Sequence, residues 1–150
     1  MNLTAFLIKN NIEFEFLEKK STHHAQEASE VSNIPLDKIA KTIVFVDRDS
    51  RPLIAIIRAD HNVSRHKLQS HSGSKSVRLA SEEIAEKATS YPTGGIPPIG
   101  HRKKLPVFLD KELLNREYVW CGGGTRTRLV KLKMKDIIRL NDPTICDLQR

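Results

Sequence analysis

The feature that most constrains the fold is a pair of apolar, β-branched runs in the first half of the chain. KTIVFV at residues 41–46 and LIAIIRA at residues 53–59 are separated by the polar, turn-forming sequence DRDSRP. Val and Ile favour strands, and two such runs on either side of a short turn are typical of a β-hairpin. The sequence therefore predicts a buried hairpin at residues 41–59.

The other segments alternate between helical and strand patterns. Helices are expected at residues 3–7, from a Thr22 cap to Val31, from starts at Ser64 and Ser81, and at residues 134–140. Strands are expected at residues 12–16, 107–110, 117–120 and 128–133. No linker, repeat or low-complexity segment interrupts this order, so we expect one domain over residues 1–150. The predicted class is α/β (α+β), with a mixed, barrel-like β-sheet surrounded by helices.

Composition narrows the class of protein. Two cysteines, Cys121 and Cys146, cannot form a disulfide framework and indicate a reducing compartment. The apolar runs fall far short of the ~20 residues of a membrane span, so we expect a soluble, cytoplasmic protein.

Lys and Arg number 25 against 18 Asp and Glu, and much of the excess lies in the second half. That charge suggests a polyanionic partner, although a solvated basic surface explains it equally well.

The spacing of the histidines argues against a metal site. His61, His66 and His71 recur every five residues. Five residues rotate by about 140° on a helix and change faces on a strand, so neither element brings the three rings together. We expect neither a metal nor an organic cofactor.

Glycine and proline are concentrated in SYPTGGIPPIG, residues 90–100. Gly94 and Gly95 can bring main-chain N–H groups against a ligand, and Pro97 and Pro98 stiffen the turn that follows. Rigid backbone donors can hold a carbonyl whose oxygen becomes negative during acyl transfer. Taken alone, a structural turn is the simpler explanation.

A second glycine-rich segment is CGGGTRTR, residues 121–128. It lacks the ending of a P-loop and the spacing of a dinucleotide fingerprint, so a glycine hairpin is favoured over an anion-binding loop. Cys121 has no Cys–His signature around it, and a packing role is favoured over a nucleophilic one.

Taken together, four segments resemble the YbaK/EbsC family, whose domain is also inserted in bacterial prolyl-tRNA synthetases as an editing domain. These segments are IAKTIVF, TSYPTGGIPPIG, LPVFLD and EYVWCGGGTRTRLVKL, in the order and approximate spacing of the family. The resemblance covers about residues 3–140, and its most specific part is the lysine followed by the GGxxP loop.

This resemblance implies hydrolysis of the ester that joins a wrong amino acid to tRNA, as in the family's free-standing Cys-tRNA(Pro) deacylases. Lys41 matches the family's functional lysine and would present its charge to the terminal phosphate or to the substrate. The residues implied in catalysis are Lys41, Gly94 and Gly95, and those implied in substrate binding are Tyr91, Ile96, Pro98 and Gly123. The implied partner is mischarged tRNA, and prolyl-tRNA synthetase is a further candidate.

Two positions depart from the family pattern. Ser90 stands where a glycine is usual, and Pro97 stands where a serine is usual, which affects the expected preference for cysteine. A non-catalytic tRNA- or synthetase-binding module is the alternative function, and a nucleotide-binding protein ranks last because no phosphate fingerprint is present. The residues do not distinguish attack by water from attack by the substrate's own thiol.

Overall fold

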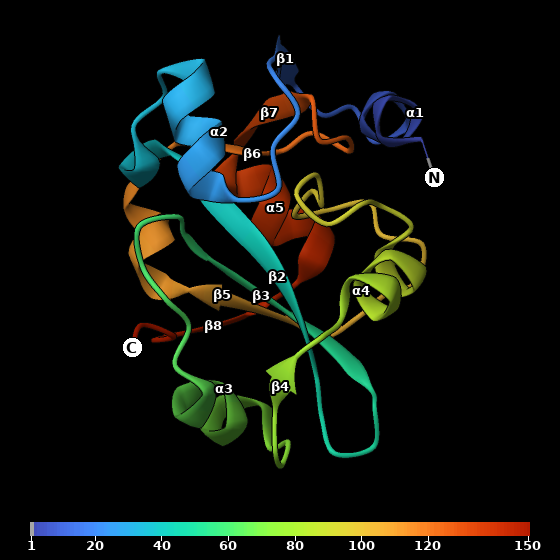
Figure 1. Ribbon diagram of the computed structural model, residues 1–150, viewed down its shortest axis with the longest axis vertical. Coiled ribbons are helices and arrows are strands. Elements are labelled where there is room, and N and C mark those ends of the chain that lie inside the picture. Colours follow the sequence, from blue (N-terminus) through green and yellow to red (C-terminus); the bar gives the residue numbers. More distant parts are fainter. Residues whose placement is uncertain (1) are drawn as a thin grey trace.

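The computed structural model describes residues 2–150, in which two sheets are combined with five α-helices and two short 3-10 helices (Figure 1). The helices are α1 (Leu3–Lys9), α2 (Ala25–Ser32), η1 (Leu36–Lys38), α3 (Arg65–Ser72), α4 (Glu82–Thr89), η2 (Lys111–Asn115) and α5 (Met134–Asn141). The strands are β1 (Phe14–Glu18), β2 (Ala40–Val46), β3 (Pro52–Arg58), β4 (Arg78–Leu79), β5 (Val107–Asp110), β6 (Tyr118–Gly122), β7 (Arg128–Lys133) and β8 (Thr144–Cys146). None of the described helices is long and apolar enough to cross a membrane.

The larger sheet has the strand order β4-β2-β3-β5-β8 and is built around the predicted hairpin. β2 and β3 are antiparallel, whereas β3 pairs with β5 and β5 with β8 in parallel. The Asp47 carboxylate closes the hairpin turn by accepting hydrogen bonds from the N–H groups of Asp49 and Arg51 at 2.8 and 3.0 Å. The predicted hairpin is therefore confirmed, with a polar turn that satisfies its own backbone.

The smaller sheet has the order β1-β7-β6, and both of its pairings are antiparallel. The glycine-rich segment connects β6 to β7, so the hairpin interpretation of this segment is confirmed. In Figure 1 this sheet lies with α2 and the start of β2 at one end of the molecule, and α3 and β4 lie at the other end.

Both faces of the central hairpin are buried. Ile54 and Ile56 of β3 belong to a core shared with the smaller sheet, whereas Ala55 and Ile57 belong to a second core beneath α3. This alternation is the period of two expected of a strand, and it explains why residues 53–57 carry no polar side chain. The mixed α+β class is confirmed, but the two sheets do not close into a barrel.

The expected helix starts at Ser64 and Ser81 are confirmed, because each hydroxyl accepts the N–H three residues ahead. The expected cap at Thr22 is wrong. α2 begins after His24, and the buried Thr22 hydroxyl lies 2.5 Å from the Lys19 ammonium instead. The N–H group of Thr22 also donates to the distant carbonyl of Arg126 at 3.0 Å, a contact that no neighbouring residue indicates.

Candidate active site

A cavity of about 490 Å³ lies where the start of β2 meets α2, α4, β4 and the loop that follows α4. Most of its wall is formed by small or aliphatic residues: Ala25, Ala28, Ile39, Ala40, Ile43, Val44, Ala59, Leu79, Ala80, Ala85, Gly94, Ile96, Gly122 and Leu129. Its polar lining consists of His23, His24, Gln26, Lys41, Thr42, Glu82 and Thr93. Apolar pockets with a few convergent polar groups are the usual form of small-molecule sites.

Lys41 is the only lysine among the residues that line this cavity. It is half-buried, and among residues 2–150 no carboxylate lies within 4.0 Å of its ammonium. Burial lowers the pKa of Lys41, and the negative charge of Asp60 partly opposes that shift. A poorly solvated cation without a partner has strong potential to bind an anion or a polarised carbonyl.

The loop at residues 91–100 is held by hydrogen bonds to its carbonyl groups. Three of the groups that donate these hydrogen bonds belong to residues far from the loop in the sequence. The bonds run from Arg126 Nε to Thr93 O at 2.7 Å, from Gly124 N to Gly95 O at 2.8 Å, and from Asn141 Nδ2 to Pro98 O at 2.8 Å. The Tyr91 hydroxyl joins the two ends of the loop by donating to the carbonyl of Gly100. These contacts make the loop a rigid wall of the cavity.

The N–H groups of this loop differ in availability. Gly95 N–H donates to the Pro92 carbonyl at 2.9 Å, within a turn. Gly94 and Ile96 line the cavity, and within residues 2–150 neither N–H group has a protein acceptor. These two N–H groups are therefore the candidate donors to a bound substrate.

Close backbone packing explains the glycines. A Cβ atom on Gly94 would lie 2.6 Å from the Thr22 carbonyl oxygen, and one on Gly95 would lie 2.6 Å from that of Thr125. A Cβ atom on Gly122 would lie 2.4 Å from the carbonyl oxygen of Ile96. Three segments distant in the sequence therefore pack backbone against backbone, which only glycine permits.

Two threonine hydroxyls were missed by the sequence analysis. The Oγ1 atoms of Thr42 and Thr93 are buried, have no hydrogen-bond partner among the described residues, and belong to residues that line the cavity. An unpaired buried hydroxyl is costly, so these groups are available to a ligand. Thr42 could have been predicted from its position next to the candidate Lys41, whereas no local pattern indicated Thr93.

The structure separates the predicted site residues into two groups. Lys41, Gly94 and Ile96 line the cavity. The others do not line it: Gly95, Tyr91, Pro98 and Gly123. Tyr91 and Pro98 are buried and hold the loop through their hydrogen bonds, and the lining glycine of β6 is Gly122 rather than its neighbour.

Cys121 is fully buried, and burial raises the pKa of its thiol. A buried, protonated thiol is a poor nucleophile, which agrees with the favoured packing role. Its side chain belongs to the core shared by the two sheets.

Neither of the two departures from the family pattern lines the cavity. Ser90 ends α4 in the left-handed conformation with φ of 68°, and its N–H donates to the carbonyl of Glu86. Pro97 is buried, and its carbonyl accepts from His101 Nε2 at 2.6 Å. A glycine at position 90 thus serves helix termination rather than chemistry.

We predict that Ser90→Gly raises the free energy of unfolding by about 1 kcal/mol, because glycine adopts a positive φ without steric cost. Urea unfolding of both proteins measures this difference. Ser81→Gly is the control, since position 81 has φ of −64° and its hydroxyl caps α4. That control should be destabilised, and a destabilised Ser90→Gly would contradict the prediction.

The family is identified by residues 19–140, which match the model of the aminoacyl-tRNA editing domain. The chain belongs to this family, and the resemblance found in the sequence is confirmed.

Curated relatives include free-standing proteins and synthetase domains. EbsC of Enterococcus faecalis, named as a candidate Cys-tRNA(Pro)/Cys-tRNA(Cys) deacylase, is 27% identical over 91% of this chain and 83% of its own length. The proline–tRNA ligase of Nitratidesulfovibrio vulgaris is 35% identical over 69% of this chain. Because the match covers only 18% of that ligase, the similarity concerns one part of a much longer protein.

Solved structures agree with this assignment. One, described as a candidate trans-editing enzyme for prolyl-tRNA synthetase, is 28% identical, with a TM-score of 0.80 over 91% of this chain and 87% of its own. A hypothetical protein superposes with a TM-score of 0.88 over 99% of both chains at 21% identity. The second likeness supports the fold alone.

Proposed function

We propose that this protein is a trans-acting aminoacyl-tRNA deacylase that hydrolyses the ester of mischarged tRNA. Its substrate would be tRNA(Pro) carrying cysteine or another small residue. The observation that carries this proposal is the cavity that combines an unpaired Lys41 with the free N–H groups of Gly94 and Ile96. Its membership of the editing-domain family supports the same reaction class.

In this proposal the protein supplies position and polarity. The N–H groups of Gly94 and Ile96 would donate to the aminoacyl carbonyl oxygen as it becomes negative. The Lys41 ammonium would bind the terminal phosphate or add to that positive field. When water attacks the carbonyl carbon, the bond to the ribose oxygen breaks, the ribose hydroxyl gains a proton, and the free amino acid is released.

The cavity also bears on the choice of amino acid. The hydrogen bonds that hold its loop would oppose rearrangement around a large side chain, which favours a small substrate. The unpaired hydroxyls of Thr42 and Thr93 would satisfy a polar group of the substrate, such as its α-ammonium. Either water or a thiol of the substrate could attack the ester. Only a substrate that carries a thiol allows the second mechanism.

The test is deacylation of tRNA(Pro) charged separately with Cys, Ala, Ser and Pro. Rapid release of one small residue, with Pro-tRNA(Pro) left intact, is the expected result and would identify the substrate. Release of cysteine alone, with no release of serine, would favour attack by the substrate's own thiol. Binding of all four without release would contradict the proposal and favour the non-catalytic binding module.

We expect the deacylation rate to fall as the pH rises. This fall should occur at a lower pH than the one at which an ordinary lysine loses its charge. Burial lowers the pKa of Lys41 below 10.5, so its charged form is lost as pH rises through that lowered value. Asp60→Asn removes the charge that raises this pKa, and the falling limb should move to lower pH.

The measurement is the deacylation rate against pH, after subtraction of uncatalysed ester hydrolysis at each pH. Asp142→Asn is the matched control, because it removes one exposed carboxylate that forms no ion pair among residues 2–150. A shift of equal size in both variants would contradict the assignment of the limb to Lys41.

A further inference from the structure

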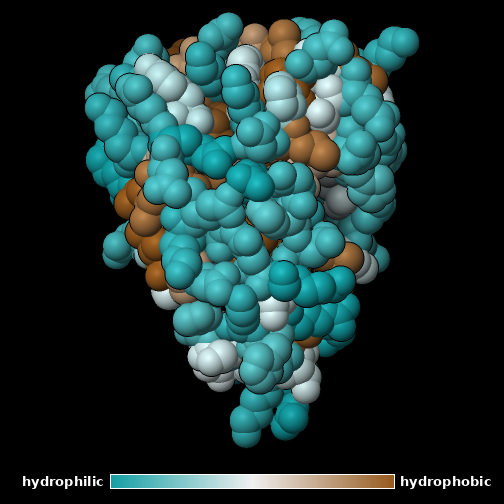
Figure 2. All heavy atoms as spheres, turned by 90° about the vertical axis from the view of Figure 1, so that its left-hand side faces the viewer, coloured by the Kyte–Doolittle hydropathy of each residue, from teal (hydrophilic) through white to brown (hydrophobic). Residues whose placement is uncertain are grey.

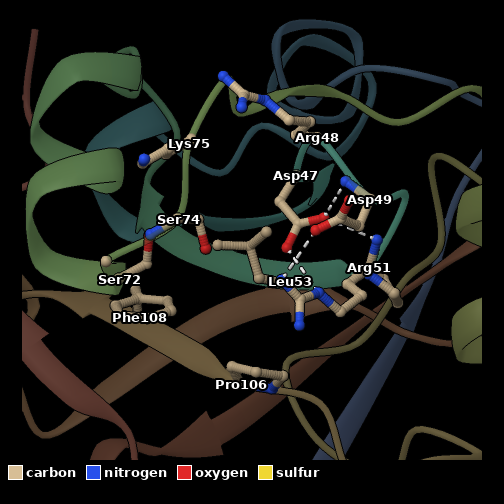
Figure 3. A pocket seen from close by; sticks show the side chains of 12 residues that line it. Asp47, Arg48, Asp49, Arg51, Leu53, Ser72, Ser74, Lys75, Pro106 and Phe108 are labelled. Atoms are coloured by element: carbon tan, nitrogen blue, oxygen red, sulfur yellow. Dashed lines mark hydrogen bonds and ion pairs between the residues drawn. The ribbon is translucent and has the colours of Figure 1, made fainter.

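A second hollow, of about 510 Å³, lies at the end of the molecule that holds α3 and the β2–β3 turn (Figure 1), and Figure 3 shows the residues that line it. It is formed by the β2–β3 turn, the end of α3 and the start of β5, with Leu53 and Phe108 among its apolar residues. Along β2, six residues at about 3.3 Å each separate Asp47 from Lys41 by about 20 Å. This hollow is therefore distinct from the cavity that contains Lys41.

The rim of this hollow carries three cations and two carboxylates. Arg51 pairs with both carboxylates, at 3.0 Å from Asp47 and 3.2 Å from Asp49. Arg48 and Lys75 are exposed, and within residues 2–150 neither has a carboxylate within 4.0 Å. Figure 3 shows the charged ends of these two side chains away from the paired carboxylates.

A basic segment lies between the glycine-proline loop and β5. Arg102, Lys103 and Lys104 follow the glycine-proline loop and precede Pro106, which lines the second hollow. All three are exposed, and none forms an ion pair within the described part of the chain. We call the set Arg48, Lys75, Arg102, Lys103 and Lys104 the distal basic surface.

We propose that the distal basic surface binds phosphate groups in the helical arm of the substrate RNA. This inference rests on the proposed function, because it concerns the same substrate. A cavity of about 490 Å³ can enclose only the charged end of a tRNA, so the rest must be bound outside it. Phosphate contacts supply a large share of the affinity of proteins for nucleic acids.

The character of the surface favours RNA over a protein partner. Protein interfaces depend on buried aromatic and apolar anchors. The large exposed hydrophobic residues of the described chain are Ile8, Val31, Leu79, Leu114, Tyr118 and Ile145, and none of them lines this hollow. Figure 2 shows that hydrophilic side chains predominate over the narrow lower end of the molecule.

The test is the salt dependence of binding to uncharged tRNA(Pro). The triple variant Arg48→Gln/Lys75→Gln/Lys103→Gln removes three charges from the distal basic surface. The matched control Lys9→Gln/Lys38→Gln/Lys111→Gln removes three exposed charges elsewhere. Both variants have the same net charge, so a difference between them reports position and not total charge.

Each lost phosphate contact lowers the slope of log K against log salt by about 0.7 to 0.9, so we expect the triple variant to lose about 2 in slope. The control should retain the wild-type slope. Equal slopes for variant and control, or a wild-type protein that does not bind uncharged tRNA, would overturn the inference. Binding is measured without an ester, so a failure of deacylation leaves this result independent.

Discussion

Lys41→Ala should lower the rate constant for deacylation by about two to three orders of magnitude, the usual effect of removing one preorganised electrostatic group. Lys41 lines the cavity, and its ammonium has no ion-pair partner within residues 2–150, so its charge is free to act on the substrate. Stability should change little, because removing a half-buried, unpaired cation also removes its desolvation cost. The measurement combines single-turnover deacylation with urea unfolding.

Lys38→Ala is the matched control for this substitution. Lys38 lies three residues earlier, is exposed, and does not line the cavity. Loss of the same single charge should leave its deacylation rate near that of the wild type. Wild-type turnover by Lys41→Ala would refute the catalytic assignment, whereas slow turnover caused by unfolding would be visible in the urea curve.

Gly94→Ala should destabilise the protein by about 2 to 5 kcal/mol, which combines the cost of a positive φ with that of overpacking. Gly94 has φ of 92°, and its new methyl group would meet the backbone of Thr22 and His23 at 2.6 to 2.8 Å. Backbone atoms cannot rotate aside as a flexible side chain does. The loop or the segment before α2 must therefore move, which would also displace the Gly94 N–H from the cavity.

Gly73→Ala is the control for the steric part of this effect. Gly73 has φ of 72°, but a Cβ atom there would meet nothing within 4 Å. It should cost only about 1 to 2 kcal/mol, for the left-handed conformation alone. Urea unfolding of both variants gives the comparison, and equal destabilisation would show that close packing at Gly94 has no energetic weight.

Several elements could be predicted because their signals are local. The hairpin of β2 and β3 follows from β-branched runs on either side of a polar turn, and the starts of α3 and α4 follow from serine caps. The hydrogen bond from the Thr22 N–H to the Arg126 carbonyl has no such local signal. The strands β4 and β8, which are two and three residues long, were not predicted. Closure of a sheet into a barrel also depends on pairing between distant strands, and the expected barrel is absent from the two described sheets.

The fold class, the candidate lysine and the glycine-rich loop could all be predicted from the residues alone. Which groups of that loop are free to bind a ligand became clear from the folded chain. Gly95 N–H is used in a turn, whereas those of Gly94 and Ile96 have no acceptor within residues 2–150, and Thr93 joins Thr42 as an unpaired hydroxyl. Whether an N–H or hydroxyl group has a hydrogen-bond partner depends on contacts between segments far apart in the chain. Those contacts cannot be predicted from the neighbouring residues.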